Sequence, residues 1–153
     1  MNREDLEGLT TTFYVAAPED GAWGLSAEQF EAGLRRLSAQ TMTVPLAAPQ
    51  DMSQHLAFDD HSLVFAVHVG DVPVEGQFMD AAQSLNIGPC TVGEAAAFIE
   101  WFQSLLPEGA RIRFNSEEGV ESGDMSDHWI PVGAQRDVVG EGLLDHLDEV
   151  VDE

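Results

Sequence analysis

Residues 91–115 read TVGEAAAFIEWFQSLLPEGARIRFN, and they combine a capped amphipathic helix with the strand that follows it. Thr91 begins the helix as its N-cap, and Glu94 completes a capping box three residues later. Apolar residues at i, i+3, i+4 and i+7 predict one buried helix face, made of Ala95, Phe98, Ile99, Phe102, Leu105 and Leu106. Pro107-Glu108-Gly109 ends the helix, and alternation over residues 110–115 predicts a half-buried strand.

A second capped helix is predicted upstream, over about residues 27–39. Ser26 serves as its N-cap, and Gln29 supplies the capping box. Residues 11–17 are rich in β-forming side chains and predict a strand before this helix. Residues 1–10 read as a short polar leader.

The middle of the chain predicts a β-hairpin. Residues 62–69 give the strongest strand pattern, and apolar residues at both odd and even positions predict that both of its faces are covered. A turn at residues 70–73 leads to an antiparallel partner over residues 74–82. Residues 41–46 predict a short strand that Pro45 confines to an edge, and residues 47–60 read as a loop.

The last third holds an irregular segment and a helix. Residues 116–136 show no periodicity, whereas apolar residues from 137 to 151 outline an amphipathic helix whose first turns are weakened by Gly140 and Gly142. The element order predicts an α+β fold. We expect an antiparallel or mixed sheet with two helices on one face (βαββαβ-like), plus a C-terminal amphipathic helix, in a single domain of residues 1–153.

The charge balance of the chain is strongly acidic. It has 28 Asp and Glu against six arginines and no lysine, for a net charge of −22. Such a protein repels nucleic acid and anionic membranes and attracts basic partners. A high-GC genome or a salt-rich cytoplasm explains the same balance without a partner. Because 44% of the residues are apolar, the acidity does not indicate disorder.

Several features predict a cytoplasmic protein that makes no contact with membranes. The first seven residues are acidic, whereas a signal peptide begins with basic residues and an apolar stretch. The longest apolar run, residues 63–67, is far below the roughly 20 residues that span a bilayer. The single cysteine, Cys90, agrees with a reducing compartment.

The negative charge is concentrated at the C-terminal end. Residues 117–153 contain 12 acidic residues and one basic residue, Arg136. Like charges four residues apart on a helix cost roughly 0.2–0.5 kcal/mol per pair, so helix stability alone does not explain this pattern. A solvated face is the alternative to a binding surface. The candidate partner-binding residues are Glu117, Glu118, Glu121, Asp124, Asp127, Trp129, Glu141, Asp145, Asp148 and Asp152.

Trp129 stands in the irregular segment beside His128 and several carboxylates. A Trp among acidic residues suits an interface that receives Arg or Lys from a partner. The alternative is a β-hairpin that turns at Gly119 or Gly123 and packs Trp129 on the core. The segment lacks the ligand register of an EF-hand calcium loop.

No catalytic motif is present, so we expect no catalytic residue, no metal and no cofactor. His61 and His68 are seven residues apart, which places them on opposite faces of a regular strand. Cys90 precedes the second capped helix, whose N-terminus would lower the pKa of the thiol. A small enzyme that uses His61, His68 or Cys90 in a pocket remains an alternative.

The stretch from Thr91 through RFNSEEGVESG, residues 113–123, resembles a pattern in small uncharacterised acidic proteins of actinobacteria. In size, acidity and layout the chain is also similar to immunity proteins of polymorphic toxin systems, which are compact α/β domains. The resemblance implies a binding protein that neutralises a basic partner, and it implies no catalytic residues.

The leading hypothesis is therefore a non-enzymatic, immunity- or antitoxin-like protein whose partner is a basic toxin or a nucleic-acid-binding protein. Charge reversal of Glu117, Glu118 and Glu121 should slow association more than dissociation. The alternatives are a nucleic-acid-mimicking inhibitor of a DNA-binding protein, a small enzyme with a His/Cys pocket, and a structural subunit whose acidity has no partner.

Overall fold

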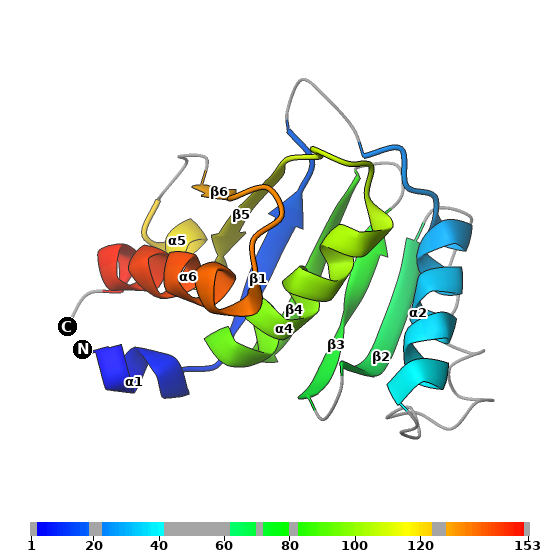
Figure 1. The fold of residues 1–153 in the computed structure, drawn as a ribbon. Coiled ribbons are helices and arrows are strands. Elements are labelled where there is room, and N and C mark those ends of the chain that lie inside the picture. The colour runs from blue at the N-terminus through cyan, green and yellow to red at the C-terminus, as the bar shows by residue number, and fades with distance from the viewer. Residues whose placement is uncertain are drawn as a thin grey trace.

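A computed structural model describes residues 3–18, 23–41, 62–69, 72–79, 83–123 and 128–151. Over these residues the fold is α+β, with helices packed on a six-stranded antiparallel sheet of order β2-β3-β4-β1-β5-β6 (Figure 1). The strands are β1 Thr11–Ala16, β2 Ser62–Val69, β3 Val72–Met79, β4 Ser84–Cys90, β5 Ile112–Ser116 and β6 His128–Ile130. The helices are α1 Arg3–Gly8, α2 Ala27–Thr41, α4 Val92–Phe102, α5 Glu117–Glu121 and α6 Arg136–Val150, with a 3-10 turn η1 at Gln103–Leu105. No helix in this part of the chain is long and apolar enough to cross a membrane.

Both predicted capping boxes are confirmed. At the start of α2, the Gln29 amide donates to Ser26 Oγ over 3.1 Å, and the Ser26 amide donates to Gln29 Oε1 over 2.9 Å. At the start of α4, the Thr91 amide donates to Glu94 Oε1 over 2.8 Å, and the Glu94 amide donates to Thr91 Oγ1 over 3.3 Å. These side chains satisfy backbone amides that have no partner within the helix.

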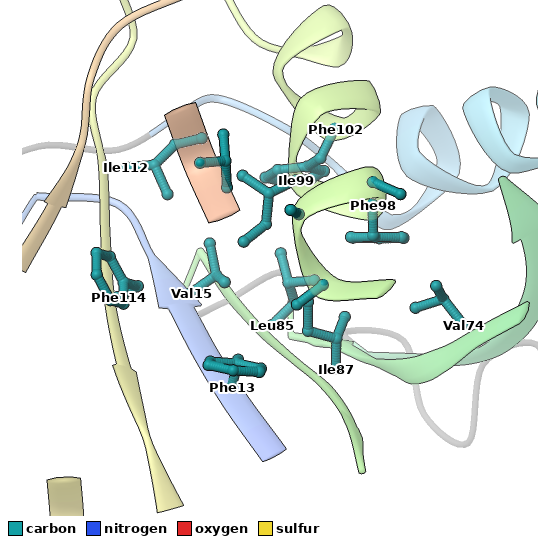
Figure 2. Packing of buried hydrophobic residues seen from close by; sticks show 14 of the residues in the cluster. Phe13, Val15, Val74, Leu85, Ile87, Phe98, Ile99, Phe102, Ile112 and Phe114 are labelled. Carbon is teal, nitrogen blue, oxygen red and sulfur yellow. The ribbon is translucent and has the colours of Figure 1, made fainter. Parts of the chain in front are cut away.

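The hydrophobic core lies between one face of the sheet and the helices. Phe98, Ile99 and Phe102 of α4 lie over Val15, Leu85 and Ile87 of the central strands (Figure 2). Phe30 of α2 extends this core toward β2 and β3, with ring centroids 5.1 Å from Phe65 and 4.8 Å from Phe78. Aromatic rings at these separations contribute to packing beyond the area that they bury.

The strand β2 buries only one of its faces completely, which corrects the expectation that both faces are covered. Phe65, Val67 and Val69 are buried, whereas Val64 and Ala66 on the other face are half-buried. Over the described residues the helices pack on the Phe65 side of the sheet, because α2 and α4 contact β2 there. The strand therefore resembles the one-sided strands of antiparallel sheets.

The strand β4 was not predicted from the sequence. It pairs antiparallel with both β3 and β1, so it joins the two halves of the sheet. Gly88, with φ of +123°, and the following Pro89 gave this segment the composition of a turn. The expected partner of β2 over residues 74–82 is confirmed as β3, which ends earlier, at Met79. It also begins earlier, because Val72 and Pro73 of the turn expected at 70–73 already pair with Val69 and His68.

Other differences lie near the ends of predicted elements. Residues 3–8 of the expected polar leader form α1, whose Leu6 is buried. Thr41 is the last residue of α2, and the rest of the edge strand expected at 41–46 lies outside the described residues, as does the loop expected at 47–60.

Candidate functional site

The helix α5 occupies part of the segment that showed no periodicity. Ser116 is its N-cap, and its Oγ accepts a hydrogen bond from the Gly119 amide over 3.1 Å. Glu117 and Glu118 stand in the first turn, where the dipole of a helix favours anions. Of the two positions considered for a β-hairpin turn, Gly119 is wrong because it lies inside a helix, whereas Gly123 is a turn residue with φ of +84°, and β5 and β6 do pair antiparallel.

A buried polar contact joins α5 to α6. Ser116 Oγ lies 2.8 Å from Nε2 of His146, and the two residues are 0% and 2% exposed. The contact satisfies the Ser116 hydroxyl and Nε2 of His146, as the burial of polar groups requires. With no exposed surface, Ser116 cannot reach a substrate, so the pair fixes the packing of the two helices. It does not form a catalytic dyad.

His146 was missed in the sequence, although its position carried a signal. It stands three residues after Leu143 and four before Val150, within the apolar stripe of the last helix. A histidine in such a stripe is expected to be buried and hydrogen-bonded, as His146 is.

Gly119 lets α5 approach α6 closely. A Cβ atom added at this position would lie 2.0 Å from Asn115 Oδ1 and 3.0 Å from His146 Cε1. The Asn115 oxygen is held in place because it accepts a hydrogen bond from the Ser116 amide over 2.8 Å. Any larger residue must therefore displace the Asn115 side chain and crowd the His146 ring.

Three acidic helices gather at one end of the molecule. α6 contacts both α1 and α5, and Figure 1 shows all three at the end opposite α2. We call this the acidic end. Its carboxylates are Glu4, Asp5 and Glu7 of α1, Glu117, Glu118 and Glu121 of α5, and Asp137, Glu141, Asp145, Asp148 and Glu149 of α6.

The predicted acidic residues are brought together in part. Glu117, Glu121, Glu141, Asp145 and Asp148 are exposed at the acidic end. Glu118 is half-buried and accepts a hydrogen bond from the hydroxyl of Thr11, so it also attaches α5 to β1. Asp124, Asp127 and Asp152 lie outside the described residues.

The acidic residues of α6 are regularly spaced. Asp137, Glu141, Asp145 and Glu149 follow one another at intervals of four residues, so each is a neighbour of the next on the surface of the helix. We call this set the carboxylate stripe. Asp137 and Glu149 were not among the predicted binding residues, although the four-residue spacing is visible in the sequence.

Trp129 lies on β6, opposite Arg113 of β5, and is half-buried. The guanidinium carbon of Arg111 stands 3.9 Å from the centroid of its ring, which is a cation–π contact. One ring face that was expected to receive a cation from a partner is thus occupied by a residue of the same chain.

A hollow of about 290 Å³ opens beside Trp129, between β6 and α6. Phe114, His128 and His146 form an aromatic cluster along it, with centroids of the two histidine rings 4.5 Å apart. Asp145 and Glu149 of the carboxylate stripe also line the hollow. Sequence reasoning placed His128 beside Trp129 but had no means of pairing it with His146.

The environment of Cys90 contradicts the alternative in which the helix N-terminus lowers the pKa of its thiol. Its side chain is 3% exposed, and burial, together with the nearby Glu94 carboxylate, raises the pKa of the thiol to about 12. Desolvation disfavours the thiolate more strongly than the helix N-terminus favours it. Cys90 is therefore a core residue.

Of the two histidines named in the small-enzyme alternative, the structure describes only His68. His68 lies half-buried on β2, and its Nδ1 has no hydrogen-bond partner within the described residues, whereas His61 lies outside them. Among the described side chains, no three His, Cys, Asp or Glu residues come together in a way that would hold a metal ion.

Comparisons with protein-family models, with curated proteins and with solved structures found no match to this chain.

Proposed function

We propose that this protein is a small, immunity- or antitoxin-like binding protein that neutralises a basic protein partner through its acidic end. The observation that supports the proposal is the uneven distribution of charge. Eleven of the 17 acidic residues that the structure describes belong to α1, α5 and α6. These three helices also carry two arginines, Arg3 and Arg136, whereas Arg35 and Arg36 stand on α2, at the opposite end. An acidity that served solubility alone would have no reason to concentrate on one end.

The carboxylate stripe supports the same function energetically. Its four members form three like-charge pairs at i, i+4, and each pair destabilises a helix by roughly 0.2–0.5 kcal/mol. A basic partner relieves this repulsion when it binds. The same field attracts the partner from a distance and raises association rates on the order of 10- to 1,000-fold at low salt.

The proposal is tested by capturing partners from host lysate at low and at high salt, and then measuring association kinetics with the captured protein. We expect one basic protein to bind stoichiometrically and to weaken steeply with salt. The variant Glu117→Gln/Glu121→Gln/Glu141→Gln should lower the association rate constant about tenfold, with a much smaller effect on dissociation. Glu118 is left intact because it bonds to Thr11.

A matched control separates the acidic end from net charge in general. Glu28, Glu75 and Glu108 are exposed and lie on α2, on β3 and in the turn after η1. Replacing these three by Gln changes the net charge equally but should leave the association rate within about twofold of the original. Equal losses in the two triple variants, or no captured protein at either salt concentration, would refute the proposal.

The spacing of the carboxylate stripe favours one particular kind of basic partner. Residues four apart on a helix are separated by about 6 Å along its axis, so the stripe is a regular row of negative charges, as the phosphates of a nucleic-acid strand are. A nucleic-acid mimic that occupies a DNA-binding protein is therefore the second candidate. Release of the captured partner by competing duplex DNA would show that this protein is a nucleic-acid mimic. If the partner is retained, it binds the acidic end through a surface other than its DNA-binding site.

A further inference from the structure

The hollow between β6 and α6 differs from the rest of the acidic end because it combines aromatic walls with carboxylates. The half-buried rings along it are those of His128 and Trp129, whereas Phe114 and His146 are almost fully buried, and Asp145 and Glu149 supply negative charge. Its volume of about 290 Å³ lies just below the roughly 300–1,000 Å³ of sites for drug-sized ligands. A space of this size suits one amino-acid side chain.

We propose that the hollow binds the guanidinium group of a single arginine from the basic partner, an inference that rests on the function proposed above. Arginine is always charged, and its planar group both stacks on aromatic rings and pairs with carboxylates in a forked geometry. Lysine carries a compact, strongly hydrated ammonium, for which aromatic walls are less suitable. The anchor of the interface is thus an arginine side chain held between the rings and the carboxylates.

The neighbouring residue pair Arg111 and Trp129 supports this choice of ligand. Trp129 also lines the hollow, and Arg111 already stacks on its ring at 3.9 Å. The described part of the chain therefore contains one arginine–aromatic contact beside the hollow. An arginine of the partner bound in the hollow would add a second guanidinium beside an aromatic ring, on the side of α6. Buried arginine anchors of this kind contribute disproportionately to binding at interfaces.

Gly142 keeps the hollow open. It lines the hollow from α6, and a Cβ atom added to it would meet nothing within 4 Å. A larger side chain at this position therefore causes no clash within the helix, and it occupies the space in which we propose that the ligand binds. Leucine also favours helix more than glycine does, so Gly142→Leu should fold at least as stably as the original protein. Gly142→Ala is the matched control, because a methyl group leaves most of the hollow free.

The experiment is an NMR titration of the whole protein with N-acetyl-arginine amide. The probe should shift the signals of Gly142, Glu149 and the His128 ring saturably, with a dissociation constant in roughly the millimolar range. N-acetyl-citrulline amide has the same shape without the charge, and it should bind at least about tenfold more weakly. Gly142→Leu should weaken binding by at least about tenfold, and Gly142→Ala by less than about threefold.

Three results would overturn the inference. They are the absence of a saturable response, an equal response to the citrulline probe, and equal binding by Gly142→Leu. The same two glycine variants are then compared for binding to the captured basic partner. If both bind it equally tightly, the arginine anchor is wrong while the proposed function stands. If the triple glutamine variant keeps full association speed, the proposed function itself fails.

Discussion

At the scale of single residues, burial determines the chemistry of this chain more than position along the sequence does. Cys90 directly precedes a helix, yet its thiol is shielded from water and faces the Glu94 carboxylate. His146 stands on an acidic helix, yet it is buried and bonded to Ser116. In both cases the surroundings in the folded protein determine the burial and reactivity of the side chain, and the neighbouring residues in the sequence do not indicate them.

We expect Cys90 in the folded protein to be almost unreactive toward iodoacetamide at pH 9. With a pKa of about 12, its thiolate fraction at that pH is on the order of a thousandth, against about half in the unfolded chain. Mass spectrometry of the alkylated protein, with and without denaturant, measures the difference. Rapid alkylation without denaturant would contradict the buried position of the thiol.

The raised pKa of the Cys90 thiol also affects stability. The pKa of the thiol in the folded protein lies above its pKa in the unfolded chain, so the buried neutral thiol stabilises the protein fully below pH about 9. This stabilisation is lost as the pH rises toward 12, at about 1.4 kcal/mol per pH unit. The free energies of unfolding of the protein and of Cys90→Ala, both measured by chemical denaturation, should therefore converge over this pH range.

At the scale of elements, the position of the short helix α5 depends on tertiary contacts. Five residues are too few to form a stable isolated helix, so α5 is held by the Ser116 cap, the bond from Thr11 to Glu118 and the close contact with His146. These contacts come from β1, β5 and α6. This explains why local periodicity gave no sign of the helix.

Two glycine-to-alanine changes should have opposite effects on stability. Gly119→Ala should destabilise the protein by about 1–3 kcal/mol, because the added methyl collides with Asn115 and His146. Gly142→Ala should stabilise it by about 0.5–1 kcal/mol, because alanine favours helix and the space is open. Urea denaturation measures both. Equal effects of the two changes would show that Asn115 and His146 do not crowd Gly119.

At the scale of the whole molecule, most of the sheet and both capped helices were predictable because their signals are local. Capping boxes, the continuous apolar run of β2 and the alternation of β5 depend on residues close together in the chain. The strand β4 was missed because Gly88 and Pro89 are turn formers, and only pairing with β1 and β3 keeps them in a sheet. The acidic end was predicted as a charged stretch, whereas the joining of α1 to it and the pairing of His128 with His146 require the three-dimensional fold.

The excess of negative charge predicts that salt stabilises the protein. The ion pairs Arg35–Glu31 and Arg136–Glu100 are exposed and contribute little, so screening mainly removes repulsion at the acidic end. Raising sodium chloride from about 0.01 to 0.15 M shortens the screening length from roughly 30 to 8 Å and should raise Tm by several degrees. Glu117→Gln/Glu121→Gln/Glu141→Gln should show a smaller rise. A Tm that falls with salt would indicate that attractive ion pairs dominate.

The open space at Gly142 has a consequence for the evolution of the chain. Alanine or leucine at this position would strengthen α6, so a population selected only for heat resistance should replace the glycine early. Lineages selected for partner binding should instead retain it despite the lost stability. The residue found at position 142 in descendants of this sequence would then show whether they had been selected for stability or for partner binding.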